Sequence, residues 1–304
     1  MAAGVRPSSL HFRLGSGDAE RDRIHAFVRA LSDRHIHVLD LPYRLASPAY
    51  GSSEAALWET DQRELAAFAV WQPAFKMLDY GMDPRHGVTQ LGDGLIDWIE
   101  SWFGQQAQAR VGPLTCWLKV GAANCDLIPL LERRGFSRCP WSIVHLERPL
   151  GAGARPELPP GFSIRSSSHV SAESWAELHR AVFPRVGMSA EWRLGITRSH
   201  GYCGNLDLIV VSADEPAVAF CCAWAGHLQS ERVGEIEPLG AHPDFRGKRL
   251  GRAVLQEVMR RMAAEGVARV FVEPWDDNVG AVHAYESLGF RPTFKIPTFA
   301  KRYS

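Results

Sequence analysis

The sequence predicts an α/β (α+β) protein built as two consecutive domains, each organised around one sheet. Three observations support this. Extended and helical patterns alternate after residue 161, a stretch rich in Pro, Gly and Ala spans residues 149–161, and the two halves share motifs at matching spacing. Strands interleaved with helices form layered folds, and the unpatterned stretch is typical of an interdomain connection.

Length and composition agree with two domains. The chain has 304 residues, 46% hydrophobic and 22% charged, which is enough for two cores of about 150 residues each. We therefore expect domains at residues 1–150 and 151–304. The formal net charge is zero, so no global field draws the chain toward nucleic acid or an anionic membrane.

The cysteines and the N-terminus indicate a cytoplasmic protein. No cysteine pair has CxxC spacing and no histidine cluster lies near one, so we expect reduced thiols and no metal. Residues 1–17 lack the apolar core of a signal peptide, and no 18-residue apolar run occurs. The cysteines are Cys116, Cys125, Cys139, Cys203, Cys221 and Cys222.

The second half has a clear order of elements. Its strongest helix is amphipathic, with apolar residues four positions apart, and two of its extended runs resemble a hairpin. The predicted strands are Phe162–Arg165, Leu206–Ser212, Ala217–Ala225, Glu235–Ala241 and Arg269–Glu273, and the predicted helices are Ala172–Phe183, Ser189–Thr197, Arg249–Ala264 and Gly280–Leu288.

The two halves end alike. Asn124–Phe136 aligns with Asn278–Phe290 without a gap, and the Asn, Glu, Gly and Phe residues are identical. Upstream, Pro84 precedes a Leu-Gly pair by seven residues, and Pro243 does the same. Matching order and spacing at two separate places indicate an internal duplication.

The segment His242–Ala253 predicts an anion site. It passes from a strand through a turn with Gly247 into the long helix. Free N–H groups at a helix N-terminus bind anions, and the glycines at 247 and 251 let the backbone approach an oxyanion closely.

Cations crowd this helix start, although the positive end of the dipole disfavours them. The placement is explained by a bound polyanion; the alternative is a solvated basic surface. In the first half, His86–Asp93 carries no Lys or Arg. The cations are Arg246, Lys248, Arg249 and Arg252.

The pattern Arg246-x-x-Arg249-x-Gly251 resembles the [Gln/Arg]-x-x-Gly-x-[Gly/Ala] signature of the GCN5-related N-acetyltransferase (GNAT) family. Arg249 departs from it by replacing the first Gly. A second family motif follows about 30 residues later, in Asn278, Ala281, Tyr285 and Gly289-Phe290. Both motifs in order are more specific than either alone, and the resemblance covers residues 160–304 well.

The resemblance implies two tandem GNAT-like domains, each a mixed, mostly antiparallel sheet flanked by helices, with acetyl-CoA as co-substrate. It also implies that the strand before the helix splays from its neighbour at a bulge, so that backbone groups bind the pantetheine arm. The residues expected to contact acetyl-CoA are Leu239, Ala241, Arg246, Gly247, Lys248, Arg249, Leu250, Gly251, Arg252 and Asn278.

Three residues are candidates for acid–base catalysis. Glu235 stands where many family members have their general base, and Glu237 lies two residues further along. Either carboxylate can face the acceptor, and either can be an exposed strand charge. By resemblance, Tyr285 protonates the leaving thiolate, for which a phenol with a pKa near 10 is suited; the alternative is a core tyrosine.

The first half lacks this chemistry. Leu131 occupies the position of Tyr285, and Gly87 that of Arg246. Residues 1–150 are therefore expected to form a degenerate, non-catalytic copy that helps to shape the acceptor pocket. Trp71–Phe75 and Leu41–Tyr50 are candidate pocket walls, or simply core.

These observations predict transfer of acetyl from acetyl-CoA to a primary amine of a small molecule, by direct attack in a ternary complex. An acyl-CoA sensor or scaffold without turnover is one alternative. Another is acetylation of a cysteinyl amine, as in the tandem mycothiol synthase-like members that the architecture resembles. We expect no nucleic acid or membrane partner. The acceptor, the acyl chain length and the oligomeric state stay open.

Overall fold

The computed structural model describes residues 9–31, 39–51, 55–86, 88–109 and 112–304. The chain forms two compact units. Unit 1 comprises residues 1–36, 49–142 and 296–304, and unit 2 comprises residues 37–48 and 143–295. Neither unit is one uninterrupted segment, so a single cut at residue 150 does not separate them.

Unit 1 contains strands in the order β1-β2-β3-β4-β5-β12, antiparallel except for the parallel pair β4–β5. Apolar side chains of α4 and α5 pack with those of the strands in its core. Its elements are β1 (Leu10–Gly15), α1 (Asp18–Leu31), α3 (Pro48–Gly51), β2 (Ala55–Thr60), β3 (Leu65–Gln72), β4 (Met77–Met82), α4 (Val88–Gln108), β5 (Leu114–Lys119) and α5 (Ile128–Arg133).

Unit 2 contains strands in the order β6-β11-β10-β9-β8-β7, antiparallel except for the parallel pair β10–β11. Its elements are α2 (Leu41–Leu45), β6 (Ser137–Pro149), β7 (Phe162–Ser166), α6 (Ala172–Val182), α7 (Ala190–Arg198), β8 (Asp207–Ser212), β9 (Ala219–Leu228), β10 (Glu231–Ala241), α8 (Leu250–Ala264), β11 (Arg269–Val272) and α9 (Val279–Glu286). The strand β12 (Arg291–Tyr303) begins in unit 2 and ends in unit 1, whereas β6 begins in unit 1 and ends in unit 2.

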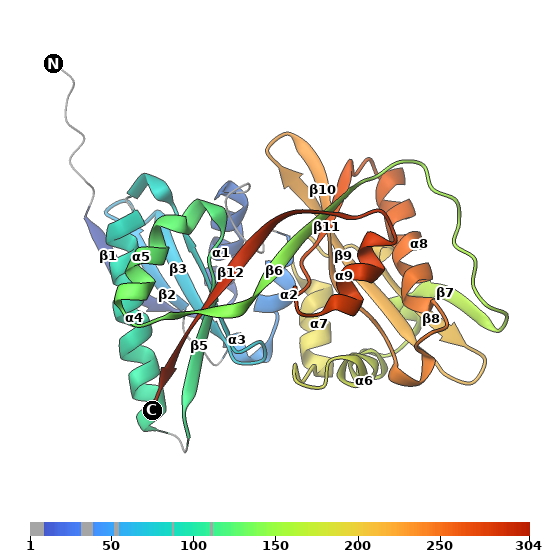
Figure 1. Cartoon of the computed structure of the whole chain (residues 1–304), viewed down its shortest axis with the longest axis horizontal. Helices are drawn as coiled ribbons and strands as arrows, with labels where there is room; N and C mark the ends of the chain where they lie inside the picture. Colours follow the sequence, from blue (N-terminus) through green and yellow to red (C-terminus); the bar gives the residue numbers. More distant parts are fainter. Residues whose placement is uncertain (1–8, 32–38, 52–54, 87, 110–111) are drawn as a thin grey trace. The chain divides into compact units, whose positions relative to one another are not determined.

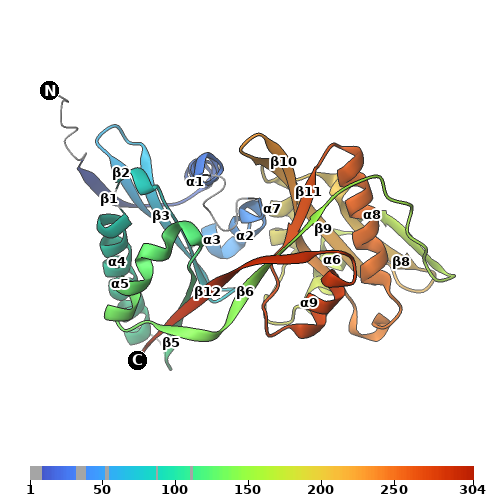
Figure 2. The same cartoon turned by 45° about the horizontal axis from the view of Figure 1, so that its top comes forward.

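The two faces of the unit 2 sheet are covered by different helices. Because side chains alternate along β9, Cys221 faces one way and Phe220 the other. Cys221 packs in the core formed with α8, whereas the Phe220 ring lies 5.1 Å from Trp175 of α6. Figure 2 shows α8 along the strands β8–β10, and Figure 1 shows α6 beside α7.

The duplication expected from the motifs is visible in both units. Each has four antiparallel strands, a long helix, a fifth strand parallel to the fourth, a short helix and a long last strand. The short helices end alike: the N–H of Phe136 donates to the carbonyl of Leu131, and that of Phe290 donates to the carbonyl of Tyr285. The glycine before each phenylalanine has positive φ, as a left-handed helix cap requires.

The last strand of each half begins in one unit and ends in the other. The end of β6 pairs with β11 inside unit 2, from Leu146 to Pro149. The end of β12 pairs with β5 inside unit 1, from Thr298 to Tyr303. Each sheet is thus completed by a strand that begins in the other unit.

The predicted elements of the second half are all present, and the structure adds to them. The unforeseen strand is β12, which contains Pro292 and Pro297 in a sequence without clear alternation. β10 starts four residues before its predicted beginning, at Glu231. Among the described residues, no helix has both the length and the apolar character needed to cross a membrane.

Candidate active site

The predicted anion site has the expected backbone. After β10, a 3-10 turn at Pro243–Phe245 leads to Gly247, with φ of 79°, and to Arg249, with φ of 61°. α8 then begins at Leu250, and no side chain of the described residues caps its first turn. The N–H groups of that turn therefore have no intrahelical acceptor and are free for an anion.

Arg249 occupies a left-handed conformation, which explains why the family signature has glycine there. A non-glycine residue at positive φ destabilises the folded state by about 1–2 kcal/mol. Glycine removes this cost, but its greater conformational freedom in the unfolded chain offsets part of the gain. We expect Arg249→Gly to raise the free energy of unfolding of the ligand-free protein by about 0.5–1 kcal/mol, measured by urea denaturation. Arg246→Gly is the control, since Arg246 has φ of −62°; stabilisation by both changes would contradict this explanation.

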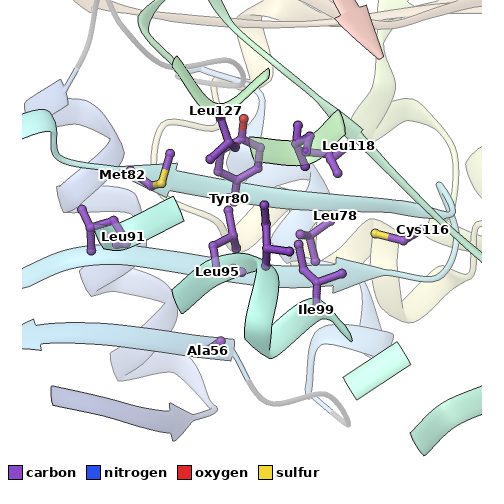
Figure 3. Packing of buried hydrophobic residues seen from close by; sticks show 14 of the residues in the cluster. Ala56, Leu78, Tyr80, Met82, Leu91, Leu95, Ile99, Cys116, Leu118 and Leu127 are labelled. Carbon is purple, nitrogen blue, oxygen red and sulfur yellow. The ribbon is translucent and has the colours of Figure 1, made fainter. Parts of the chain in front are cut away.

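The surroundings of the glycine at the last position of the signature differ between the units. A Cβ on Gly251 would meet no atom within 4 Å, whereas one on Gly92 would lie 2.6 Å from Cδ1 of Leu127. Leu127 is buried in the core of unit 1, among the side chains that Figure 3 shows. The space beside the helix is open in unit 2 and filled in unit 1.

The cations at the start of α8 lack counter-charges. Arg246, Lys248, Arg249 and Arg252 are exposed, and none forms an ion pair with the described residues. Arg252 donates to Oγ of Ser287 at 3.0 Å, and Nζ of Lys248 lies near two phenyl rings. Position 87, which corresponds to Arg246 in the first half, lies outside the described residues.

β10 splays from β11 beside a bulge. The parallel pairing with β11 covers Val233–Glu235, and among the described residues it does not continue to Ala241. On the other side, the register with β9 shifts between Ile236 and Leu239. The edge of β10 that carries Leu239 and Ala241 is thus available to an extended ligand, which can bind such an edge as an added strand.

Glu235 lies in the paired part of β10 and is 3% exposed. Burial raises the pKa of its carboxyl, and the charges of Asp40, Glu273 and Glu237 raise it further. The backbone N–H of Asp40 donates to its Oε2 at 3.1 Å and opposes this rise. A carboxylate with a raised pKa is a better proton acceptor near neutral pH than an exposed one.

Glu237 lies within the bulge, and its carbonyl accepts a hydrogen bond from Nε1 of Trp224 at 2.8 Å. Tyr285, on α9, is partly buried and packs edge-on against Phe290. Burial raises the pKa of Tyr285, and the charges of Cys221 and Glu237 add to the rise. The charge of Glu237 thus raises the pKa of both Glu235 and Tyr285 within unit 2.

Asn278 caps α9. Its Oδ1 accepts a hydrogen bond from the N–H of Ala281 at 3.3 Å. This satisfies one free donor of the first turn, as the sequence predicted. The side-chain N–H groups of Asn278 stay exposed beside the helix start.

A segment from the N-terminal half belongs to this site. Asp40 and α2 are part of unit 2. The hydroxyl of Tyr43 and Nε2 of His179 lie 3.0 Å apart, and Nε1 of Trp192 donates to the Tyr43 carbonyl. The sequence singled out Leu41–Tyr50 for its aromatic residues, but no local pattern indicated that Asp40 would contact Glu235, 195 positions away.

His145 was also not foreseen. Its Nδ1 lies 2.9 Å from Oε1 of Glu273, and its Nε2 lies 3.0 Å from Oε1 of Glu147. The ring stacks between Phe271 and Phe294. These contacts hold the imidazole ring in place between two carboxyl groups and two phenyl rings.

Unit 2 therefore combines an uncapped, cationic helix start, an open strand edge, a buried carboxylate and a buried phenol. An acyl donor with phosphate groups fits the first two features, and proton transfer fits the other two. These are the features of an acyltransferase whose acyl donor is a thioester that carries phosphate groups.

Comparison with known proteins agrees with this class. Residues 172–290 match the acetyltransferase (GNAT) family. The chain therefore contains a domain of the GCN5-related N-acetyltransferase family. Its fold resembles that of a GCN5-related N-acetyltransferase from Sphaerobacter thermophilus, with a TM-score of 0.65, 19% identity, and coverage of 96% of this chain and 95% of that one. A tandem GNAT protein from the clavulanic acid biosynthesis pathway has a TM-score of 0.62, 13% identity, and coverage of 97% and 98%.

The curated relatives are more similar in sequence. A mycothiol acetyltransferase of Frankia alni is 30% identical over 229 residues, which are 69% of this chain and 65% of that protein. A mycothiol acetyltransferase of Streptomyces coelicolor is 28% identical over 154 residues, or 49% of each. The matched region thus spans between half and two thirds of these relatives.

Proposed function

We propose that unit 2 transfers acetyl from acetyl-CoA to a primary amine of a small molecule, and that unit 1 is non-catalytic. The main support is the contrast at the helix start. Gly251 of unit 2 faces open space beside unpaired cations, whereas Leu127 of unit 1 fills the space beside Gly92. Only the first arrangement admits a pyrophosphate.

In this proposal, the first turn of α8 and its cations bind the pyrophosphate, and the open edge of β10 binds the pantetheine arm. A backbone N–H near Leu239 polarises the thioester carbonyl. Glu235 takes a proton from the acceptor ammonium, and the amine nitrogen attacks the carbonyl carbon. As the C–S bond breaks, Tyr285 donates its proton to the thiolate and the resulting phenolate takes the second proton from the nitrogen. The products are the acetamide and CoA, and Glu235 releases its proton to solvent.

We propose a general class of acceptor and, within it, a more specific one. The general proposal is a primary amine, because the raised pKa of Glu235 suits a base that removes a proton from an ammonium group. The finer proposal is a cysteinyl amine, supported by relatives named mycothiol acetyltransferase. Both proposals are tested by measuring the rate at which the CoA thiol is released with a panel of amines that includes cysteinyl glycosides.

The stoichiometry of acetyl-CoA binding tests the assignment of unit 2. By calorimetry we expect one site per chain, and a loss of affinity of more than about 100-fold in Arg246→Glu/Arg252→Glu, because two charge-assisted contacts become repulsive. Arg85→Glu/Arg133→Glu, in unit 1, is the control. Two sites per chain would contradict the role of unit 1, and no binding would contradict the acetyltransferase function.

A further inference from the structure

A cavity lined by arginines lies along α8, beyond the residues that the family signature identifies. Its volume is about 470 Å³, within the range of about 300–1,000 Å³ typical of small-molecule sites. One wall is α8 from Arg249 to Arg260, and another is the segment 150–157 between β6 and β7. Figure 1 shows this segment passing α8 before it reaches β7. All these residues belong to unit 2.

The cavity has a strong excess of positive charge. Glu157 is the one carboxylate among its lining residues. The guanidinium groups that line it are those of Arg148, Arg155, Arg249, Arg252 and Arg260.

Three of these arginines have hydrogen-bond partners, and one of the three is Arg252, which donates to Oγ of Ser287. Arg260 is bound through two nitrogens by Glu257, and Arg148 donates to the carbonyl of Leu288 at 2.5 Å. Arg155, Arg249 and Arg252 form no ion pair with any described residue. Uncompensated like charges around one hollow repel one another, and an anion with several negative groups removes this repulsion.

The cavity continues from the proposed pyrophosphate site. Arg249, Arg252, Gln256 and Arg260 are spaced three or four residues apart, so they lie along one side of α8. At about 1.5 Å per residue, this side extends about 16 Å from Arg249. In acetyl-CoA, the group beyond the pyrophosphate is an adenosine with a further phosphate on its 3′ oxygen.

We infer that this cavity binds the 3′-phosphorylated adenosine end of acyl-CoA, with Arg155 selecting for the 3′-phosphate. The inference rests on the proposed function. Arg155 is exposed, unpaired and carried by a connecting segment that belongs to neither sheet. It lines the cavity together with arginines of α8, so a phosphate bound there can contact cations from two segments of the chain. The connection between the halves is thus part of the nucleotide site.

Calorimetry with CoA and 3′-dephospho-CoA tests this inference. The wild-type chain is expected to bind CoA about tenfold more tightly, the typical effect of one charge-assisted phosphate contact. Arg155→Ala should bring this ratio to about twofold while affinity for 3′-dephospho-CoA stays the same. Arg198→Ala, at the exposed end of α7, should keep the tenfold ratio. Equal affinities in the wild type, or an unchanged ratio in Arg155→Ala, would overturn the inference.

A second titration separates this inference from the proposed function. Adenosine 3′,5′-bisphosphate should bind the wild type and bind Arg155→Ala more weakly. If it does so while acetyl-CoA shows no turnover with any amine, the cavity assignment stands and the acetyltransferase function fails. If inorganic phosphate binds equally well, or adenosine 3′,5′-bisphosphate does not bind, the cavity is not a nucleotide site.

Discussion

Glu235→Gln is expected to lower kcat by about 10²–10⁴-fold, the range for loss of a general base. Its amide cannot accept the proton of the acceptor, while its shape and the contact with the Asp40 N–H are kept. Affinity for acetyl-CoA should not change, because Glu235 lies away from the helix start. Steady-state kinetics, with acetyl-CoA binding measured separately, checks both expectations.

The same substitution should stabilise the protein above pH 5. The folded pKa of Glu235 is raised above its ordinary value near 4.5, so the folded state binds the proton more tightly than the unfolded state. The wild type therefore loses stability as pH rises from about 4.5 to the folded pKa, and Glu235→Gln does not. Urea denaturation at pH 5 and pH 8 measures this difference. Glu231→Gln, on the same strand, is the control: an equal gain in stability from both changes would show that the gain does not come from the raised pKa of Glu235. An unchanged kcat in Glu235→Gln would exclude Glu235 as the base and leave Glu237.

Tyr285→Phe is expected to lower kcat by about 100-fold, because the leaving thiolate loses its proton donor. The phenyl ring keeps the contact with Phe290, so stability and acetyl-CoA affinity should change little. Because the pKa of Tyr285 is raised above its ordinary value near 10, the phenol stays protonated up to pH 10 and the loss of rate should be the same across this range. Rates measured between pH 6 and 10 test this.

Tyr303→Phe is the matched control, since Tyr303 is also partly buried but lies in unit 1. It should leave kcat unchanged. If Tyr285→Phe also leaves every rate unchanged while acetyl-CoA binds, the chain is better described as an acyl-CoA sensor.

The fold of the second half could be predicted because its signals are local. The amphipathic period of α8 and the glycine at 289 report on neighbouring residues, and both predictions are confirmed. β12 was not predicted, because a strand is stabilised by pairing with distant residues. Its partner β5 lies about 180 positions earlier in the chain.

In the site as well, features set by a short segment could be predicted, whereas contacts between distant segments could not. The positive φ of Gly247 and the uncapped start of α8 follow from a short segment, and the glycine pattern indicated them. The contact of Asp40 with Glu235 and the position of His145 between two glutamates depend on how distant segments pack. Arg155, for which we propose a contact with the 3′-phosphate, lies in a Pro- and Gly-rich segment whose composition indicates only a connection.

The reciprocal ends of β6 and β12 have a practical consequence for protein production. A fragment starting at residue 151 would lack residues 146–149, and β11 would become an unprotected sheet edge that invites aggregation. It would also lack Asp40, whose N–H donates to Glu235. Separately expressed halves should therefore be poorly soluble alone, and mixing them during refolding should recover the missing pairings.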